Sequence, residues 1–438
     1  MIVMKFGGTS LAEAEDIRKV TALVRARLPE HPVVVVSAHA GVTNELDRLA
    51  RAALERATGI VGIRERHLRI LRELDLPADL VEDLLRELES LLTGLSLVRE
   101  LTPRSLDYVH SFGELLSSRI VAARFRHEGI AARAIPSWDL GLVTDGNFGG
   151  AHPQAESWPR IRRSLERVKE LPVITGYIAK DRDGNITTLG RSGSDYTASI
   201  VGAAVGAGEI QIWTDVSGVM TADPRIVPGA RSLPRLSFAE MSELAYYGAR
   251  VIHPSTMIPA VEKKIPIRVL NTHAPEHPGT VVLDDGPGEG PAVRSIAQRR
   301  GLTLISVVST RMLLQHGFMA RLFDVFARHE VVVDMISTSE ISVSITTDSK
   351  KDLTPVVREL SAFADVEIEA GKAIVCVVGE GIRTSPDTAA DILDTLRRAA
   401  VVTRMISMGA TGINVSLLVA EEAVETAVRA LHRAFFGS

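Results

Sequence analysis

A lysine followed closely by two glycines is the first group in this sequence that could do chemistry. The chain opens with MIVMKFGGTS, in which an apolar run at residues 2–4 leads to Lys5 and then to Gly7 and Gly8. We interpret the run as a strand and the glycines as a tight turn, because glycine accepts backbone angles that other residues avoid. A helix is expected next, opened by a capping box of Ser10 and Glu13.

This order of elements has the geometry of a phosphate site. At a helix N-terminus, free backbone N–H groups point outward and the helix dipole favours negative charge. The lysine of a P-loop follows its glycines, whereas Lys5 precedes them. A phosphate site here would therefore belong to another kind of kinase. The alternative is a buried first strand with a solvated lysine at its end.

Two further stretches carry small and polar residues at useful places. SAHAGVTN (37–44) follows an apolar strand, and small residues at the carboxyl end of a parallel strand are where such folds bind ligands. Glu114 lies in HSFGELLSS (110–118), a helical segment of otherwise apolar and small residues. A glutamate in such a segment is more often solvated than functional.

The stretch GNITTLGRSGSDYTAS (184–199) is the most informative. Arg191 offers a planar guanidinium that suits a carboxylate, and Asp195 stands at the start of a helix. Asp195 could be only an N-cap, but an arginine and an aspartate this close in a glycine turn exceed what capping needs. In WTDVSGVMTADPR (213–225), Thr214 and Asp215 stand at a strand end, and turn chemistry alone could explain the final residues.

The elements that must position these groups alternate between strand and helix. Apolar, β-rich runs occur at 32–38, 172–179, 209–216 and 265–271, which is typical of a buried parallel sheet. The fold class expected is α/β, a doubly wound sheet. Residues 45–127 are expected to form a helical excursion over one sheet edge.

The pattern changes after DDGPGEGP (284–291), which we interpret as a linker. Shorter β-α-β units follow, and MIS recurs at 335–337 and 405–407. Two copies of a small β-α-β-β-α-β domain would explain this repeat, and tandem small domains suggest regulation. The alternative is a purely structural second domain. We divide the chain into 1–285, a linker at 286–300, and small domains at 301–370 and 371–438, whose last strand could return to the first.

Bulk properties exclude several classes of protein. The 438 residues carry a formal net charge of −4, which gives no reason to expect nucleic acid or a membrane surface as partner. Cys376, the single cysteine, lies in the apolar run AIVCVVG and is expected in the core. We expect no signal peptide, no membrane span and a cytoplasmic location.

Five motifs in order carry a resemblance to a known family. KFGGTS, SAHAGVTN, GRSGSDYTA, WTDVSGVMTADPR and GARVIHP (248–254) resemble the motif set of aspartate kinases. Residues 316–345 resemble the regulatory ACT pair of the monofunctional, lysine-sensitive type. The resemblance covers essentially the whole chain. It implies an amino-acid-kinase (carbamate-kinase-like) sheet followed by two ferredoxin-like ACT domains.

The same resemblance implies the reaction of ATP with L-aspartate to give ADP and 4-phospho-L-aspartate, the first step toward lysine, threonine and methionine. Lys5 and Asp195 would be catalytic, with Asp195 orienting Lys5. Lys5 and the backbone of Phe6, Gly7 and Gly8 would hold the phosphoryl group. Glu114 would meet the ammonium of aspartate and Arg191 a carboxylate. The other residues implied for aspartate are Thr43, Ser192, Gly193 and Ser194, and those for the nucleotide are Thr214, Asp215, Met220, Arg225, Arg250 and Val251.

Mg²⁺ would arrive with ATP and keep several waters, so no protein ligand is named for it. Three residues depart from the family pattern. Ser192 stands where glycine is common, Arg250 where lysine is common, and Met220 where an aromatic residue is frequent. None of these departures removes a catalytic group.

In the regulatory pair, the resemblance implies that lysine inhibits and that a homodimer or homotetramer forms through the ACT domains. Asp334 and Glu340 could meet a cationic effector, while Gln315 replaces a smaller hydroxyl residue, which leaves threonine open as the effector. The full set implied for the effector is Met312, Gln315, Phe318, Met319, Val332, Val333, Asp334, Ser339 and Glu340.

Two other functions are considered. The chain could be an amino-acid sensor that lost the reaction, although the presence of Lys5, Glu114, Arg191 and Asp195 together argues against this. It could also be a kinase for another acid, such as glutamate. Few residues follow the second small domain, so we expect no fused dehydrogenase.

Overall fold

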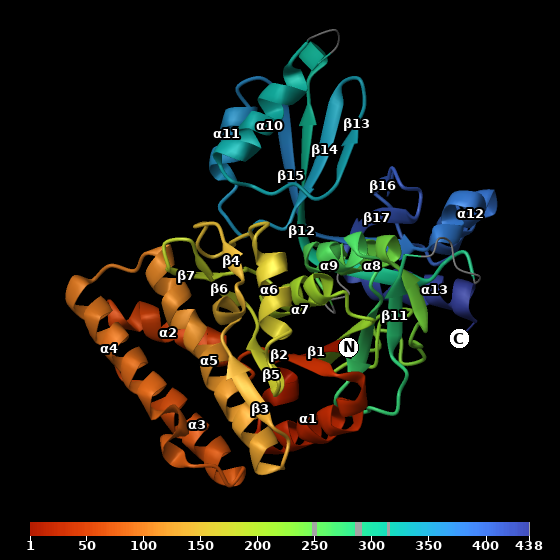
Figure 1. Cartoon of the computed structure of the whole chain (residues 1–438). Coiled ribbons are helices and arrows are strands. Elements are labelled where there is room, and N and C mark those ends of the chain that lie inside the picture. The colour runs from red at the N-terminus through yellow and green to blue at the C-terminus, as the bar shows by residue number, and fades with distance from the viewer. Residues whose placement is uncertain (248–251, 285–290, 313–315, 438) are drawn as a thin grey trace. The chain divides into compact units, whose positions relative to one another are not determined.

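The computed structural model describes residues 1–247, 252–284, 291–312 and 316–437 (Figure 1). The chain divides into two compact units. The first comprises Met1–Val219, Ser232–Phe238 and Arg250–Asp285, and the second comprises Met220–Arg231, Ala239–Ala249 and Gly286–Ser438. Among the described residues, every helix is too short or too polar to cross a membrane.

The first unit is built on an eight-stranded sheet. Its strand order is β3-β5-β2-β1-β8-β10-β11-β9. All neighbouring strands are parallel except β10 and β11, which are antiparallel. The bounds are β3 Ala132–Ile135, β5 Leu171–Thr175, β2 Pro32–Val36, β1 Ile2–Phe6, β8 Glu209–Thr214, β10 Ile267–Asn271, β11 Thr280–Leu283 and β9 Arg235–Ser237. The expected doubly wound sheet is confirmed.

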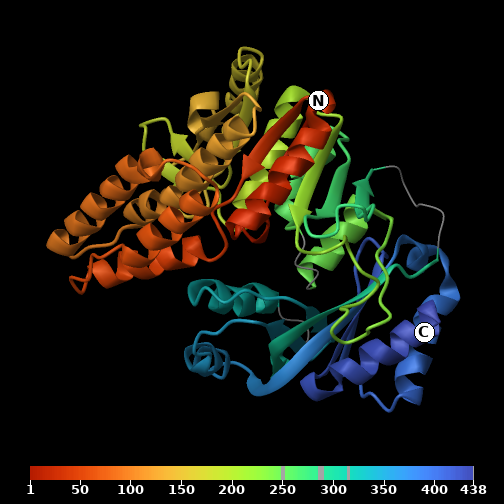
Figure 2. The same ribbon diagram turned by 90° about the horizontal axis from the view of Figure 1, so that it is seen from below.

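Helices cover both faces of this sheet, which is why its central strands are buried throughout. Met4 and Phe6 of β1 point to the face where α1 (Ala14–Arg27) packs. Figure 2 shows α1, in red, running along that face. The side chain of Lys5 points to the opposite face of the sheet, because successive side chains along a strand alternate between the two faces. That second face is covered by α7 (Gly193–Val205), whose Gly202 lies close to Val3 of β1.

The helical excursion is confirmed. It consists of α2 Val42–Ala53, α3 Val61–Glu73, α4 Glu82–Val98 and α5 Pro103–His127. The first turn of α5 is favoured by Thr102, whose hydroxyl accepts the Ser105 N–H, and by proline at the first helical position. Figure 1 shows α5 beside β3, the edge strand, and α5 also contacts β5.

The expected start of α1 is wrong. A 3₁₀ turn, η1 (Thr9–Leu11), precedes it, and the capping box joins Glu13 and Asp16 instead of Ser10 and Glu13. The Ser10 hydroxyl is instead buried 2.7 Å from the hydroxyl of Thr272. A hydrogen bond to a distant residue therefore replaces the helix-capping role that the local sequence predicted for Ser10.

The run 172–179 is two strands and not one. β5 ends at Thr175, and β6 (Ile178–Asp181) joins a separate sheet of order β4-β6-β7, with β4 at Val143–Thr144 and β7 at Ile186–Thr188. Tyr177, between β5 and β6, has a φ of 63°, a left-handed conformation that redirects the chain. The remaining helices of the chain's middle part are α6 Ser157–Leu165, α8 Phe238–Tyr246 and α9 Pro254–Glu262.

The second unit contains one six-stranded sheet of order β13-β14-β12-β15-β17-β16, all antiparallel. Its strands are β12 Ser295–Val308, β13 Ile336–Thr338, β14 Ser342–Thr347, β15 Asp365–Val378, β16 Met405–Met408 and β17 Asn414–Ala420. Its helices are α10 Phe318–Arg328, α11 Thr354–Leu360, α12 Pro386–Arg398 and α13 Val424–Phe436. Cys376 is fully buried in β15, and burial raises the pKa of its thiol.

The two small repeats share their long strands. The start of β12, Ser295–Arg299, lies in the expected linker but pairs with Ile374–Val378 of β15. β15 itself runs through the expected boundary at 370. The last strand, β17, stays with β15 and β16 and does not return to the first repeat. The division of the chain into domains at 285, 300 and 370 stays a prediction.

Candidate active site

Lys5 and Asp195 form a buried ion pair at the carboxyl end of the sheet. The Lys5 amine lies 2.6 Å from the Asp195 carboxylate, and the two side chains are 10% and 8% exposed. Lys5 is near the end of β1, and Asp195 is in the first turn of α7 on the same face of the sheet. The alternative of a solvated lysine is therefore wrong. Ligands bind at this end of the strands in open parallel sheets.

Asp195 is not the N-cap of α7. That position belongs to Ser192, which has a φ of 56° and makes no capping hydrogen bond through its side chain. Asp195 lies three residues further on, where its carboxylate faces Lys5. The left-handed backbone at Ser192 explains why glycine suits this position in the family pattern.

Glu114 is buried, so the expectation that it is solvated is also wrong. One oxygen, Oε1, accepts a hydrogen bond of 3.0 Å from the backbone N–H of Ala38. The other oxygen is buried and has no hydrogen-bond partner among the described residues. Burial raises the pKa of this carboxyl to about 8. Gly113 allows this approach, because a Cβ there would lie only 2.7 Å from that of Ala38.

Nine of the expected residues line one cavity of about 490 Å³. The N-termini of α2 and α7 both contribute to its wall, through Thr43 and through Gly193 to Asp195. Two helix N-termini at one cavity favour an anionic ligand. The nine residues are Lys5, Gly8, Thr43, Glu114, Arg191, Ser192, Gly193, Ser194 and Asp195.

The remaining expected residues lie outside this wall. Phe6 is buried, with its ring stacked on Trp213 at 6.0 Å, and Gly7 donates its N–H to the carbonyl of Trp213. Thr214 and Asp215 follow at the end of β8, where the Thr214 hydroxyl donates to the Asp215 carboxylate.

Two described residues expected at the nucleotide do not line this cavity. Met220 and Arg225 belong to the second unit, where Arg225 pairs with Asp223 at 2.6 Å. Arg250 and Val251 lie outside the described residues.

The sequence reasoning missed several lining residues, among them His39, Gly149 and Tyr177. It also missed Asp107 and His110, which stand on α5 before Glu114. The spacing of these three titratable residues at i, i+3 and i+7 places them on one helical face, and this was the available signal. His39 is fully buried and donates through Nδ1 to the Leu11 carbonyl, and burial lowers its pKa to about 3.

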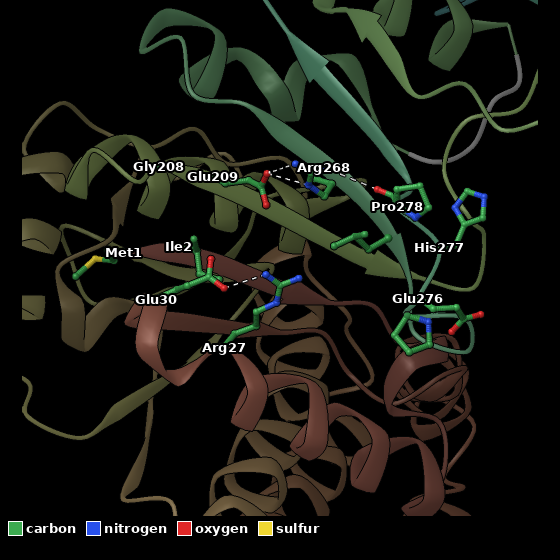
Figure 3. A pocket seen from close by; sticks show the side chains of 12 residues that line it. Met1, Ile2, Arg27, Glu30, Gly208, Glu209, Arg268, Glu276, His277 and Pro278 are labelled. Carbon is green, nitrogen blue, oxygen red and sulfur yellow. Dashed lines mark hydrogen bonds and ion pairs between the residues drawn. The ribbon is translucent and has the colours of Figure 1, made fainter.

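A larger cavity, of about 680 Å³, lies at the opposite end of the strands (Figure 3). Met1, Ile2 and Glu209 line it at the starts of β1 and β8. Its two arginines are already neutralised, Arg27 by Glu30 and Arg268 by Glu209, each at 2.9 Å. Lys5 and Asp195 lie at the other end of the sheet, so the smaller cavity is the candidate active site.

In the second unit, the Asp334 carboxylate is already engaged. Arg299 lies 2.8 Å from its Oδ1, and the Tyr246 hydroxyl donates to the same oxygen at 3.1 Å. Its Oδ2 is buried without a hydrogen-bond partner in the described part of the chain. Phe318 is in the core, with Met312, Met319 and Val333 packed against it.

Other residues expected at the effector site are more exposed to solvent. Val332 is 66% exposed, Glu340 is exposed, and Ser339 bonds to Ser342 at the surface. Gln315 lies outside the described residues. Among the residues that the structure describes, no three His, Cys, Asp or Glu side chains gather to hold a metal ion.

Comparisons with known proteins agree with this arrangement. The model of the amino acid kinase family matches residues 1–271, and an ACT domain model matches 305–362 and 375–435. Aspartokinase 2, chloroplastic, of Arabidopsis thaliana is 38% identical over 99% of this chain and 84% of its own length. Lysine-sensitive aspartokinase 3 of Escherichia coli is 35% identical over 100% of this chain and 99% of its own.

Solved structures give the same result. The structure of E. coli aspartokinase III with aspartate and ADP, in the R-state, matches with a TM-score of 0.85 and 34% identity over 100% of both chains. Its T-state structure with lysine and aspartate matches with a TM-score of 0.83 at 34% identity, over 100% of this chain and 99% of the other. The buried Lys5–Asp195 pair thus lies in a protein with full-length likeness to these enzymes. The chain belongs to the aspartokinase family, with an amino acid kinase domain followed by two ACT domains.

Proposed function

We propose that this chain transfers the terminal phosphoryl group of ATP to the side-chain carboxylate of L-aspartate, giving ADP and 4-phospho-L-aspartate. The observation that carries the proposal is a single cavity lined by the Lys5–Asp195 pair, Arg191 and a buried Glu114. Sequence identities of 38% and 35% to named aspartokinases, over 99% and 100% of this chain, support the choice of aspartate over other acids.

Lys5 acts on the moving phosphoryl group. Phosphoryl transfer needs little covalent help from the protein, so catalysis is mostly positioning and stabilisation of charge. The Lys5 amine is held in place by Asp195 and keeps N–H donors for phosphoryl oxygens. A donor fixed in advance needs no reorganisation during the reaction, which is the source of its catalytic effect.

The charges of aspartate match the polar groups of the cavity. The unpartnered Oε2 of Glu114 accepts the ammonium group, and Arg191 at the rim binds a carboxylate. The amino ends of α2 and α7 favour the remaining negative charge. Glutamate has one more methylene, which alone gives about 1–3 kcal/mol of discrimination unless the extra length breaks these pairs.

The nucleotide is proposed to bind beyond the end of β8, at Thr214 and Asp215, with Met220, Arg225, Arg250 and Val251. Mg²⁺ bound to the nucleotide phosphates supplies neutralising charge. An ion that keeps several waters needs only one or two carboxylates from a protein, so no dedicated ligand set is assigned.

Regulation is proposed to come from lysine, bound by the residues expected at the first ACT repeat. The Oδ2 atom of Asp334 supports this, because it is a buried carboxylate oxygen without a hydrogen-bond partner among the described residues, and such an oxygen suits an ammonium group. A homodimer or homotetramer through the ACT domains and a cytoplasmic location are further parts of the proposal. Neither nucleic acid nor a membrane is proposed as a partner.

Trapping the acyl phosphate with hydroxylamine tests the reaction. We expect a hydroxamate with ATP and aspartate, and a much lower rate with glutamate. A faster reaction with glutamate would replace the substrate, and no hydroxamate from either acid would favour an amino-acid sensor. Titrating lysine and threonine in the same assay tests the effector, because unchanged activity at millimolar lysine would remove that part of the proposal alone.

A further inference from the structure

Asp107 is a buried carboxylate on α5 that the proposed reaction does not use. It is 2% exposed, and it accepts three hydrogen bonds from two other parts of the chain. Oδ2 accepts the backbone N–H groups of Gly149 at 2.9 Å and of Thr188 at 2.8 Å. Oδ1 accepts the Thr188 hydroxyl at 2.8 Å. Hydrogen bonds to a charged acceptor are the strong ones in proteins.

Both partners of Asp107 belong to the rim that carries Arg191. Gly149 lines the cavity, and its carbonyl would lie 3.3 Å from a Cβ at Gly190, so the two glycines are in close contact. Thr188 ends β7, three residues before Arg191. Its carbonyl accepts the N–H of Ala151, which joins the same two segments a second time. The carboxylate therefore fixes the base of the rim.

The opposite wall of the cavity is fixed from the same helix. Glu114 lies two turns after Asp107 on α5, and it holds the Ala38 N–H. Seven residues correspond to almost two full turns, so both carboxylates project from one face. Between them, His110 lies 3.4 Å from the hydroxyl of Tyr177, another lining residue. One rigid helix thus sets the separation between Glu114 and the Arg191 rim.

We propose that Asp107 is a positioning residue that fixes the distance between the ammonium site at Glu114 and the carboxylate site at Arg191, and so selects aspartate over the longer glutamate. This inference rests on the proposed function. When a substrate carries charges at both ends, the distance between the protein groups that pair with those charges determines which substrate length fits. Misplacement by about 1 Å can cost about a hundredfold in rate, so a freed rim loses selectivity.

Asp107→Ala and Asp107→Asn separate this role from a general loss of structure. Alanine removes all three acceptor contacts and leaves the N–H groups of Gly149 and of the buried Thr188 without this partner. Asparagine keeps them, because its carbonyl can accept both N–H groups and its amide can donate to the Thr188 hydroxyl, which also accepts. Ser157→Ala is the matched control: Ser157 is fully buried and bonds Val143 of β4, in the same three-stranded sheet as β7.

The measurement is the KM for aspartate and for ATP, together with the ratio of kcat/KM for aspartate and glutamate. For Asp107→Ala we expect the KM for aspartate to rise about tenfold or more, with the KM for ATP within about twofold, and the aspartate preference to fall. Asp107→Asn and Ser157→Ala are expected to stay within about threefold of wild type in both quantities.

An equal rise in both KM values, or an unchanged preference for aspartate in Asp107→Ala, would overturn the inference. If that variant does not fold, Thr188→Val decides, since it removes only the hydroxyl bond: a raised KM for aspartate alone supports the role, and unchanged values reject it. The two proposals fail separately, because a wild-type chain without aspartyl hydroxamate ends the proposed function, whereas an active wild type with an indifferent Asp107→Ala ends only this one.

Discussion

The amine of Lys5 lies 2.6 Å from the carboxylate of Asp195, and both side chains are almost completely buried. Lys5 comes from the first strand of the chain and Asp195 from a helix 190 residues later, and α7 packs on the sheet face toward which Lys5 points. A buried charge pair of this kind depends on both partners, because removing one leaves the other uncompensated.

Replacing Lys5 by methionine is expected to lower kcat by about a hundredfold to a thousandfold, the usual effect of losing one fixed donor. It should also lower the free energy of unfolding by about 3 kcal/mol, because Asp195 keeps a buried charge. Adding Asp195→Asn should recover stability but not kcat.

Lys19→Met is the control for Lys5, since Lys19 pairs with Glu15 on the exposed side of α1. Its kcat and unfolding curve should match wild type. Near-normal turnover in the Lys5 variant would contradict its assignment.

The binding of aspartate should depend on the protonation of Glu114. Burial raises the pKa of Glu114 to about 8, so its carboxyl group is mostly protonated at pH 7 before aspartate binds. An ammonium ligand requires the deprotonated carboxylate. The KM for aspartate should therefore fall as pH rises, by about eightfold between pH 7 and 8.5, and binding should release a proton.

Initial rates across this pH range, and calorimetry in two buffers of different ionisation enthalpy, measure both effects. In Glu114→Gln, the KM should be higher and independent of pH over the same range. Proton uptake on binding, or a flat KM in wild type, would contradict the role of Glu114.

Ser192→Gly should stabilise the protein. The left-handed backbone at Ser192, with a φ of 56°, costs a residue with a side chain about 1 kcal/mol that glycine does not incur. Urea unfolding measures the gain. Ala400→Gly provides the comparison, because Ala400 has a φ of 55° after α12. A loss of stability in both variants would show that backbone strain is not the controlling factor.

Lysine inhibition should depend on the charge of Asp334. In Asp334→Asn, the lysine concentration that halves the variant's own activity should rise about tenfold or more, because an ammonium group loses its charged acceptor. Asp324→Asn is the control, since Asp324 pairs with Arg328 on the exposed side of α10. An unchanged lysine response in Asp334→Asn would remove this residue from the effector site.

Several features of the fold followed from sequence alone because they depend on local pattern. Apolar runs without polar alternation specified the buried strands β1, β2, β8 and β10, and the helical excursion followed from its composition. Glycines and hydroxyl residues at strand ends located most of the cavity wall for the same reason. Local pattern failed where a side chain had a distant partner: Ser10 bonds to Thr272 and does not cap the helix.

The sequence by itself thus determined the family, the order of the elements and half of the residues that line the candidate site. Only the tertiary structure decided which of those groups are charged, paired or open. Burial raises the pKa of Glu114, and ion-pair partners neutralise Asp334 and join Lys5 to Asp195. Burial and pairing both depend on segments that are far apart in the chain. Asp107 was found the same way, since its role lies in contacts with residues 42 and 81 positions away.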